Sequence, residues 1–169
     1  MYYIVGLGNP GEEYELTRHN TGRLALADFA KNNKVIFPDT FMNNSGKLLK
    51  NLIKSKKAAE HLIVVHDDLD LPLGRFKIVF GRDSAGHKGV ESVIKNIKTK
   101  DFIRIRVGIS PVTPSGKIKK PPAEKVINHI IGKFKHSELL VIKKLSKKIT
   151  SAIEMIIEEG LQKAMSLYN

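Results

Sequence analysis

One imidazole and one carboxylate in this chain occupy positions that suit acid–base chemistry. His19 follows a glycine-rich loop, and Asp67 comes shortly after an apolar run that ends at Val65. An imidazole with an unperturbed pKa of about 6.5 can accept a proton near neutral pH. A carboxylate that hydrogen-bonds to the ring holds it in one tautomer. The two residues therefore predict a general base, His19, that is oriented by Asp67.

Two amide side chains accompany this pair. Asn9 lies in the loop GLGNPG, and Asn43 lies in the segment FMNNSG. Amides can donate hydrogen bonds to a carbonyl group or to the oxyanion formed from it. Each residue also has a purely structural interpretation, which the sequence leaves open: His19 as a turn residue, Asp67 as a cap and Asn43 as a helix N-cap.

Other kinds of site find less support in the sequence. No pair among the six histidines has HxH or HExxH spacing, and no acidic segment has calcium-loop spacing, so no metal site is predicted. There is no GxSxG motif for a serine nucleophile. The loop GLGNPG matches a dinucleotide-binding fingerprint poorly, because its last two glycines are one residue too close. The absence of cysteine excludes disulfides and thiolate catalysis.

Alternating strands and helices are expected to position these groups. Strands are predicted at residues 2–5, 34–37, 62–65, 75–80 and 102–109. Helices are predicted at about 21–31, 46–57, 90–97, 123–131, 137–159 and 161–167. The pattern indicates one α/β domain over residues 1–169, with a mixed, mostly parallel sheet flanked by helices. Residues 110–122, rich in proline and lysine, are expected to form a mobile loop beside the site.

The charge of the chain indicates a polyanionic partner. Lysine and arginine total 29 against 17 for aspartate and glutamate, which gives a formal net charge of +12. Such an excess is typical of proteins that bind nucleic acid. No apolar stretch is long enough to cross a membrane and no secretory signal is recognisable, so a cytoplasmic protein without a membrane partner is expected.

Five segments carry a family resemblance, in the order GLGNPGEEYELTRHN, FMNNSG, VVHDDLDLPLG, AGHKGVESV and FIRIRVGIS. They resemble the bacterial peptidyl-tRNA hydrolases, and the match extends from Met1 to about Phe134. The resemblance implies an enzyme that hydrolyses the ester between a peptide and the 3′ ribose of tRNA, recycling peptidyl-tRNA. It also implies one α/β domain that acts as a monomer and needs neither a metal nor another cofactor.

The same resemblance implies roles for individual residues. His19 matches the catalytic histidine, and Asp67 matches the acid that supports it. The residues assigned to substrate binding are Asn9, Tyr14, Phe41, Met42, Asn43 and Lys88. The basic residues expected to contact tRNA phosphates are Arg104, Arg106, Lys117, Lys119, Lys120 and Lys133.

The chain departs from the family pattern in two places. The fourth segment usually reads GGHNG, whereas this chain has Ala85 for a glycine and Lys88 for the asparagine. Lysine can donate a hydrogen bond but cannot accept one, so the positioning of peptide or water is expected to differ at Lys88. A short segment before Phe41 also replaces extra strand structure, so we expect a sheet with a trimmed edge and residues 34–37 as its remnant.

Two rival functions stay open at this point. A non-catalytic RNA-binding relative of the same fold would keep the basic surface without hydrolysis. A small-molecule esterase would hydrolyse its substrate without a basic face. Salt distinguishes the esterase from an enzyme that acts on tRNA, because binding of a polyanion weakens steeply as salt rises.

Overall fold

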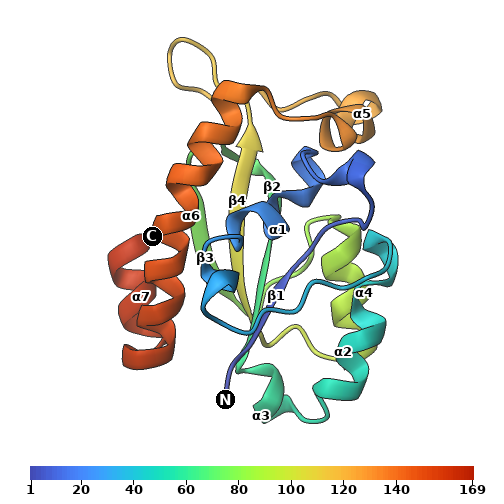
Figure 1. Cartoon of the computed structure of the whole chain (residues 1–169), viewed down its shortest axis with the longest axis vertical. Coiled ribbons are helices and arrows are strands. Elements are labelled where there is room, and N and C mark those ends of the chain that lie inside the picture. The colour runs from blue at the N-terminus through green and yellow to red at the C-terminus, as the bar shows by residue number, and fades with distance from the viewer.

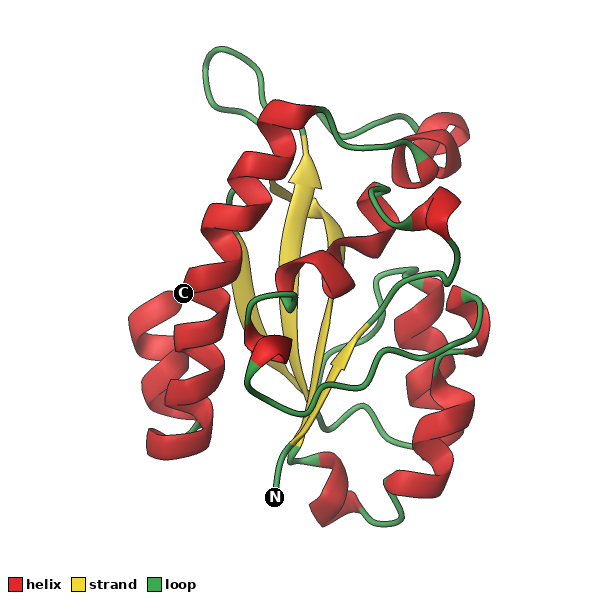
Figure 2. Cartoon of the chain, in the orientation of Figure 1, coloured by secondary structure: helices red, strands yellow, loops and turns green.

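One open sheet forms the centre of the computed structural model, which describes all 169 residues (Figures 1 and 2). Its strands are β1 (Tyr3–Gly6), β2 (Leu62–Pro72), β3 (Phe76–Phe80) and β4 (Ile103–Ser110), in the order β1-β2-β4-β3 across the sheet. β1, β2 and β4 are parallel, whereas β3 is antiparallel to β4. The predicted mixed, mostly parallel sheet is therefore confirmed.

Helices flank this sheet on both faces. They are α1 (Thr21–Ala25), α2 (Gly46–Leu52), α3 (Lys56–Ala59), α4 (Lys88–Ile97), α5 (Val126–Ile131), α6 (His136–Glu159) and α7 (Leu161–Tyr168). α1, α6 and α7 lie against one face, and α2 and α4 lie beside the other (Figure 1). None of the helices combines the length and the hydropathy that spanning a bilayer requires.

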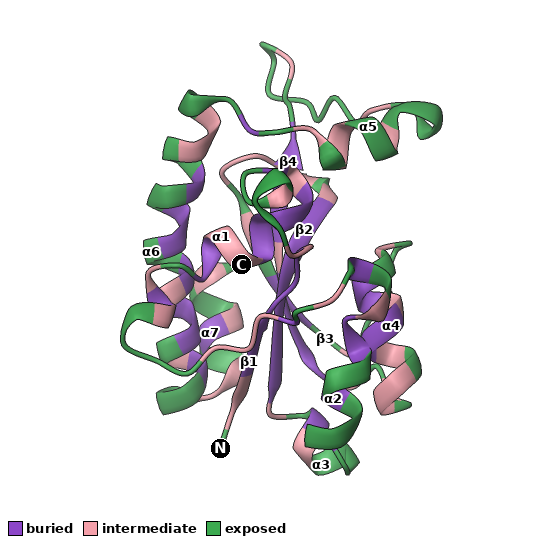
Figure 3. Ribbon diagram, turned by 45° about the vertical axis from the view of Figure 1, so that its right-hand side comes forward, coloured by how far each residue is buried: buried purple, intermediate pink, exposed green.

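Two apolar cores join the sheet to these helices. Alternate residues of a strand point to opposite faces. Ile63 and Val65 of β2 accordingly belong to the same core as Ile149 of α6, whereas Val64 belongs to the core that includes Val90 of α4. The strands are mostly buried, and the loop between β4 and α5 is mostly exposed (Figure 3). The sheet is thus a buried frame, and the loops at its carboxyl end are free to form a site.

β2 is longer than the sequence predicted. The apolar pattern indicated a strand at 62–65 with Asp67 beyond its end, but β2 continues to Pro72. Asp67 and Asp68 pair with Val107 and Gly108 of β4, so the ladder extends past the apolar residues. Pairing with a neighbouring strand sets this boundary, and hydrophobic periodicity does not record it. Asp67 is consequently held by a strand rather than by a loop.

Four other expected elements are shorter or less regular than predicted. The helix expected at 46–57 is divided into α2 and the short α3. The helix expected at 21–31 ends at Ala25, and a separate 3₁₀ turn covers Phe29–Lys31. The helix expected at 123–131 begins with a 3₁₀ turn before α5. The strand expected at 34–37 is reduced to one bridge between Val5 and Ile36, because so short a run before a proline gains few ladder hydrogen bonds. The sheet edge beyond β1 is therefore trimmed.

Candidate active site

Paired hydrogen bonds fix the segment that carries His19 to the first loop. Asn20 Oδ1 accepts from the backbone N–H of Asn9 at 2.8 Å, and Asn20 Nδ2 donates to the Asn9 carbonyl at 2.9 Å. Shortly after, Gly22 packs so closely on the carbonyl oxygen of Val65 that a Cβ atom would overlap it. Glycine at this position lets α1 rest on the backbone of β2. The close approach brings the His19 segment to the strand that carries its partner.

Arg18 ties the same segment to the region around the start of α6. Its guanidinium donates to Glu138 at 3.2 Å and to the His129 carbonyl at 3.4 Å, and it lies 5.5 Å from the centre of the Phe134 ring. The Arg18 side chain is only 13% exposed, so water screens these contacts weakly. His19 is therefore positioned from two sides, by the first loop and by the α5–α6 region.

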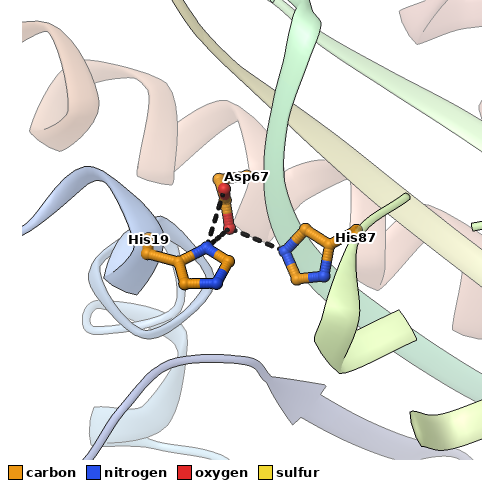
Figure 4. Close-up of side chains that lie close together, drawn as sticks. All are labelled: His19, Asp67 and His87. Carbon is orange, nitrogen blue, oxygen red and sulfur yellow. Dashed lines mark hydrogen bonds and ion pairs between the residues drawn. The ribbon is translucent and has the colours of Figure 1, made fainter. Parts of the chain in front are cut away.

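Asp67 accepts hydrogen bonds from two histidines (Figure 4). His19 Nδ1 lies 3.0 Å from each carboxylate oxygen, and His87 Nε2 lies 2.8 Å from Oδ1. His19 is 8% exposed and Asp67 is 3% exposed, so the contacts lie in a largely dry environment. The structure thus brings together the two residues that the sequence predicted as a pair, and it adds His87.

The neighbours of the two histidines determine their tautomers. An ionised carboxylate only accepts hydrogen bonds, so His19 Nδ1 and His87 Nε2 each carry the proton that faces Asp67. His87 Nδ1 accepts from the backbone N–H of Val90 at 3.3 Å, which caps the start of α4. In its neutral form, His19 keeps an unprotonated Nε2, which points away from Asp67 (Figure 4). That nitrogen is the one able to act as a base.

Burial and charge act in opposite directions on this cluster. Burial alone would lower the pKa of His19, but the charge of Asp67 and the hydrogen bond to it raise that pKa above its ordinary value. Burial alone would raise the pKa of Asp67, but His19 and His87 hold it far below the usual range. Asp67 is therefore ionised near neutral pH, and His19 is a stronger base than a free imidazole.

A third histidine packs against His87 from the interior. The rings of His66 and His87 meet edge to face with their centroids 4.7 Å apart. His66 Nδ1 donates to the Asp67 carbonyl at 2.8 Å, and its buried Nε2 has no partner within the chain. Burial, followed by the charges of His87 and Arg104, lowers the pKa of His66 well below its ordinary value. His66 is therefore a neutral ring that supports the cluster by packing.

A cavity of about 560 Å³ lies beside this cluster at the carboxyl end of β2. His19, Asp67 and His87 contribute to its wall, and Val126 and Ile130 of α5 provide an apolar side. Its volume falls in the range of roughly 300–1,000 Å³ that is usual for small-ligand sites. A substrate group in this cavity would therefore meet the histidine base directly.

The remaining predicted substrate-binding residues of the first two motifs lie outside the wall of this cavity. Asn9 Oδ1 accepts from the backbone N–H of Met42 at 2.7 Å, which joins the two motifs. Tyr14 and Phe41 meet edge to face with their centroids 6.2 Å apart. Asn43 is exposed at the surface. The structure thus gathers these residues with one another rather than around Asp67.

Met42 connects this second group to the catalytic cluster. It is 5% exposed, and a Cβ atom added to Gly89 would lie only 2.5 Å from its sulfur atom. The same Cβ would lie 3.1 Å from the ring of His87. Glycine at the start of α4 therefore allows Met42 and His87 to approach the same helix end.

The two residues that depart from the family pattern in the fourth segment, Ala85 and Lys88, both line the cavity. Ala85 has a φ of 50°, a conformation that residues other than glycine seldom adopt, so the family's glycine would fit this backbone with less strain than the alanine does. Lys88 is 71% exposed, and its ammonium group pairs with Glu91 at 3.1 Å. Lys88 therefore lies at the rim of the cavity, and its ammonium group pairs with Glu91 of its own helix rather than with Asp67.

The two arginines expected to contact tRNA are engaged within the chain. Arg104 is only 2% exposed and donates to the carbonyls of Arg82 and Asp83. Burial, and next the charge of Arg106, lowers the pKa of Arg104 to about 10. Arg106 pairs with Asp68 at 2.6 Å. The expectation that Arg104 lies on an exposed basic face is therefore wrong, because the loop after β3 covers it.

The four lysines of the predicted tRNA-binding set are exposed. Lys117, Lys119 and Lys120 belong to the loop between β4 and α5, and Lys133 lies between α5 and α6. Lys120 pairs with Asp70 at 2.6 Å and so links this loop to the end of β2 beside the cavity. Of these four lysines, Lys120 therefore lines the cavity itself.

His87 is the member of the cluster that the sequence did not predict. It lies in a glycine-bearing loop directly before a helix, which was the one available signal. Its partner Asp67 is 20 residues away, so only the fold reveals the contact. The same fold places one potential ligand atom each of His19, Asp67 and His87 within 4.8 Å of one another, a grouping that no histidine spacing indicated.

Known proteins match the whole length of the chain. A family described as peptidyl-tRNA hydrolase matches residues 3–37 and 33–169, and the two stretches meet where the sequence predicted a missing segment. The peptidyl-tRNA hydrolase of Thermodesulfovibrio yellowstonii is 37% identical over an alignment 197 positions long, which covers 100% of this chain and 99% of that protein. The peptidyl-tRNA hydrolase of Geotalea daltonii is 37% identical, with 98% and 95% covered. The crystal structure of peptidyl-tRNA hydrolase from Acinetobacter baumannii has a TM-score of 0.84 at 26% identity, with 100% of this chain and 94% of that chain covered.

Proposed function

Because the chain belongs to the peptidyl-tRNA hydrolase family, we propose that it hydrolyses the ester between a peptide and the 3′ ribose of tRNA with His19 as general base. The observation that carries the proposal is the hydrogen-bonded pair of His19 and Asp67 in the wall of the cavity. The family relatives and this pair do not favour a non-catalytic RNA-binding protein of the same fold. The chain is accordingly an ester hydrolase.

The proposed reaction begins when Nε2 of His19 removes a proton from a water molecule. The oxygen of that water attacks the ester carbonyl carbon, and a tetrahedral intermediate forms. The bond between that carbon and the 3′ oxygen then breaks, and the imidazolium returns its proton to the departing ribose oxygen. Asp67 holds the ring in the required tautomer and stabilises its charged form, which agrees with the raised pKa of His19.

Asn9 and Asn43 are proposed to bind the peptide part of the substrate. The side-chain oxygen of Asn9 is occupied by the backbone N–H of Met42, so its amide NH₂ group is the part left for a substrate carbonyl. Asn43 is exposed in the 3₁₀ turn Met42–Asn44 that precedes α2, and it can offer both a donor and an acceptor. Contacts with backbone groups would bind peptides without reading their side chains, which suits an enzyme that accepts any peptide.

Tyr14 and Phe41 are proposed to form the apolar surface next to those amides, and the buried Met42, whose backbone N–H binds Asn9, is proposed to support it. The contact between Tyr14 and Phe41, with Phe41 56% exposed, provides aromatic area against which a terminal nucleotide or a peptide side chain can pack. Lys88 at the rim is proposed as a weak substitute for the family asparagine.

The exposed lysines are proposed to bind the acceptor-stem phosphates of tRNA. They are Lys117, Lys119, Lys120 and Lys133, with Arg106 as a partly buried addition. We propose further that the enzyme acts as a cytoplasmic monomer without a metal or other cofactor, as members of this family are expected to do.

Hydrolysis of an N-blocked aminoacyl-tRNA by wild type and His19→Ala tests the proposal. Wild type should release free tRNA, and the variant should lose at least about a hundredfold in kcat/KM, the usual contribution of a positioned base. His136→Ala is the matched control, because His136 is exposed at the start of α6. Nearly full activity in His19→Ala would contradict the role of His19. If the wild type bound tRNA without cleaving the ester, the proposed hydrolase activity would be wrong.

A further inference from the structure

We propose that the His19–Asp67–His87 cluster binds a divalent transition-metal ion such as Zn²⁺, and that this ion inhibits the enzyme. The three side chains each offer one ligand atom, and these atoms lie within 4.8 Å of one another. Two imidazoles and one carboxylate are a donor set that suits Zn²⁺ and similar ions. Mg²⁺ prefers a shell made only of oxygen atoms, so the cluster should discriminate against it.

Two of the three ligand-atom pairs already have separations near those of a metal site. The ligand atoms are separated by 2.8 Å between His87 and Asp67 and by 3.0 Å between His19 and Asp67. Tetrahedral Zn²⁺ with ligand bonds of about 2.0–2.2 Å places its ligand atoms roughly 3.3 Å apart. These two pairs need to open by only a few tenths of an ångström, whereas the ligand atoms of His19 and His87, which lie within 4.8 Å of each other, would have to settle at about the same 3.3 Å separation, by movement of the two rings. All three residues contribute to the cavity wall, so a water molecule from the cavity can take the fourth position.

Proton placement explains why such an ion would inhibit. The metal would replace the two protons that now face Asp67, one on His19 Nδ1 and one on His87 Nε2. A neutral His19 that binds metal through Nδ1 carries its proton on Nε2. That nitrogen can then no longer accept a proton from water. This step rests on the proposed function of His19, whereas the coordination itself does not.

The surroundings of His87 set a limit on the affinity. With a metal on Nε2, a neutral His87 carries its proton on Nδ1. That proton would face the backbone N–H of Val90, which now donates to Nδ1 at 3.3 Å, so the cap of α4 would be lost. The site is accordingly a reversible inhibitory site rather than a permanent structural one.

Titration with Co²⁺, which replaces Zn²⁺ and reports its geometry by visible absorption, tests coordination without any substrate. Wild type should bind one equivalent with the intense bands of a tetrahedral site, and added Zn²⁺ should abolish them. His87→Asn should weaken binding at least tenfold, whereas the exposed His136→Asn should bind as wild type does. If Co²⁺ did not bind to the wild type, or bound equally well to His87→Asn, the proposed metal site would be wrong.

Inhibition of the wild type provides a second measurement that needs no variant. Zn²⁺ should abolish hydrolysis at the concentration at which it displaces Co²⁺, a chelator selective for transition metals should restore the rate, and added Mg²⁺ should not inhibit. Full activity at saturating Zn²⁺ would refute the inhibitory role. If the wild type cleaves no peptidyl-tRNA at all, the proposed function fails, and the Co²⁺ titration still decides the metal site independently.

Discussion

His19, Asp67 and His87 are nearly enclosed and bonded to one another, whereas Lys117 and Lys119 stand exposed on a loop with no ion pair within the chain. The cluster joins three separate segments, and the hydrogen bonds to Asp67 orient both histidine rings. The lysines contribute charge that water and salt screen. Catalytic geometry therefore depends on specific tertiary contacts, whereas binding of a polyanion can rest on the number of charges and their general location.

A second contrast concerns two cations of the same formal charge. Arg104 is 2% exposed and donates to two backbone carbonyls, whereas Lys119 is exposed and its ammonium group makes no hydrogen bond or ion pair within the chain. Both were expected to contact tRNA. Burial turns Arg104 into a support for the loop after β3, and exposure leaves Lys119 available to a ligand. Charge alone therefore does not identify a nucleic-acid contact.

Asp67→Asn should have the largest effect after loss of His19 itself. We expect kcat/KM to fall by about a hundredfold or more, because the amide can stabilise the wrong tautomer and carries no charge. Asp67 raises the pKa of His19, so its removal should move the acidic limb of the pH–rate profile to lower pH. Measurements of kcat/KM from about pH 5 to pH 8, a range that spans the imidazole pKa, check both the loss of activity and the shift of the acidic limb.

The matched control is Asp83→Asn, which makes the same chemical change where the side chain is 88% exposed. Asp83→Asn should change neither kcat/KM nor the acidic limb of the pH–rate profile. An unchanged acidic limb in Asp67→Asn would mean that His19 does not titrate against this carboxylate, and the proposed pair would be wrong.

Arg104→Ala should lower the free energy of unfolding by about 2 kcal/mol, because two carbonyls lose a charged donor in a buried place. Lys119→Ala should change it by less than about 0.5 kcal/mol, as is usual for exposed positions. Urea unfolding followed by circular dichroism measures both. Equal stability of the two variants would remove the distinction between the buried and the exposed cation.

Replacement of Lys117, Lys119 and Lys133 by glutamine should raise KM for tRNA substrates several-fold and leave kcat unchanged. Each lysine that contacts a phosphate should reduce the slope of log affinity against log salt by about 0.7–0.9. Steady-state rates at a series of salt concentrations measure this slope. A lower kcat with an unaltered slope would place these lysines in the catalytic step instead.

Lys88→Asn, which restores the residue of the family pattern, should have the smallest effect. The pair of Lys88 and Glu91 is solvent-exposed, and such pairs contribute at most about 1 kcal/mol. We expect kcat/KM to change less than about threefold, with Lys95→Asn on the same helix as the comparison. A tenfold change confined to Lys88→Asn would show that the rim lysine takes part in positioning substrate.

Local patterns were enough to predict much of this molecule. Apolar runs such as 62–65 identified the buried strands, because strand burial leaves a continuous hydrophobic signal. The long periodic stretch of α6 was predicted to within one residue at its start, because its apolar face repeats over many turns. The residue types of His19 and Asp67 and their positions after loop and strand signals identified the pair that the structure joins.

Contacts between distant segments settled the rest. The sequence alone did not reveal His87, because its bond to Asp67 depends on how the loop before α4 folds over β2. It could not show that Asp67 lies within β2, because β4 supplies the partner for that part of the ladder. It also gave no sign that Arg104 is covered. Residue types therefore determined which chemistry was available, and tertiary packing decided which groups meet, since burial and hydrogen bonding across the chain are not encoded in any local period.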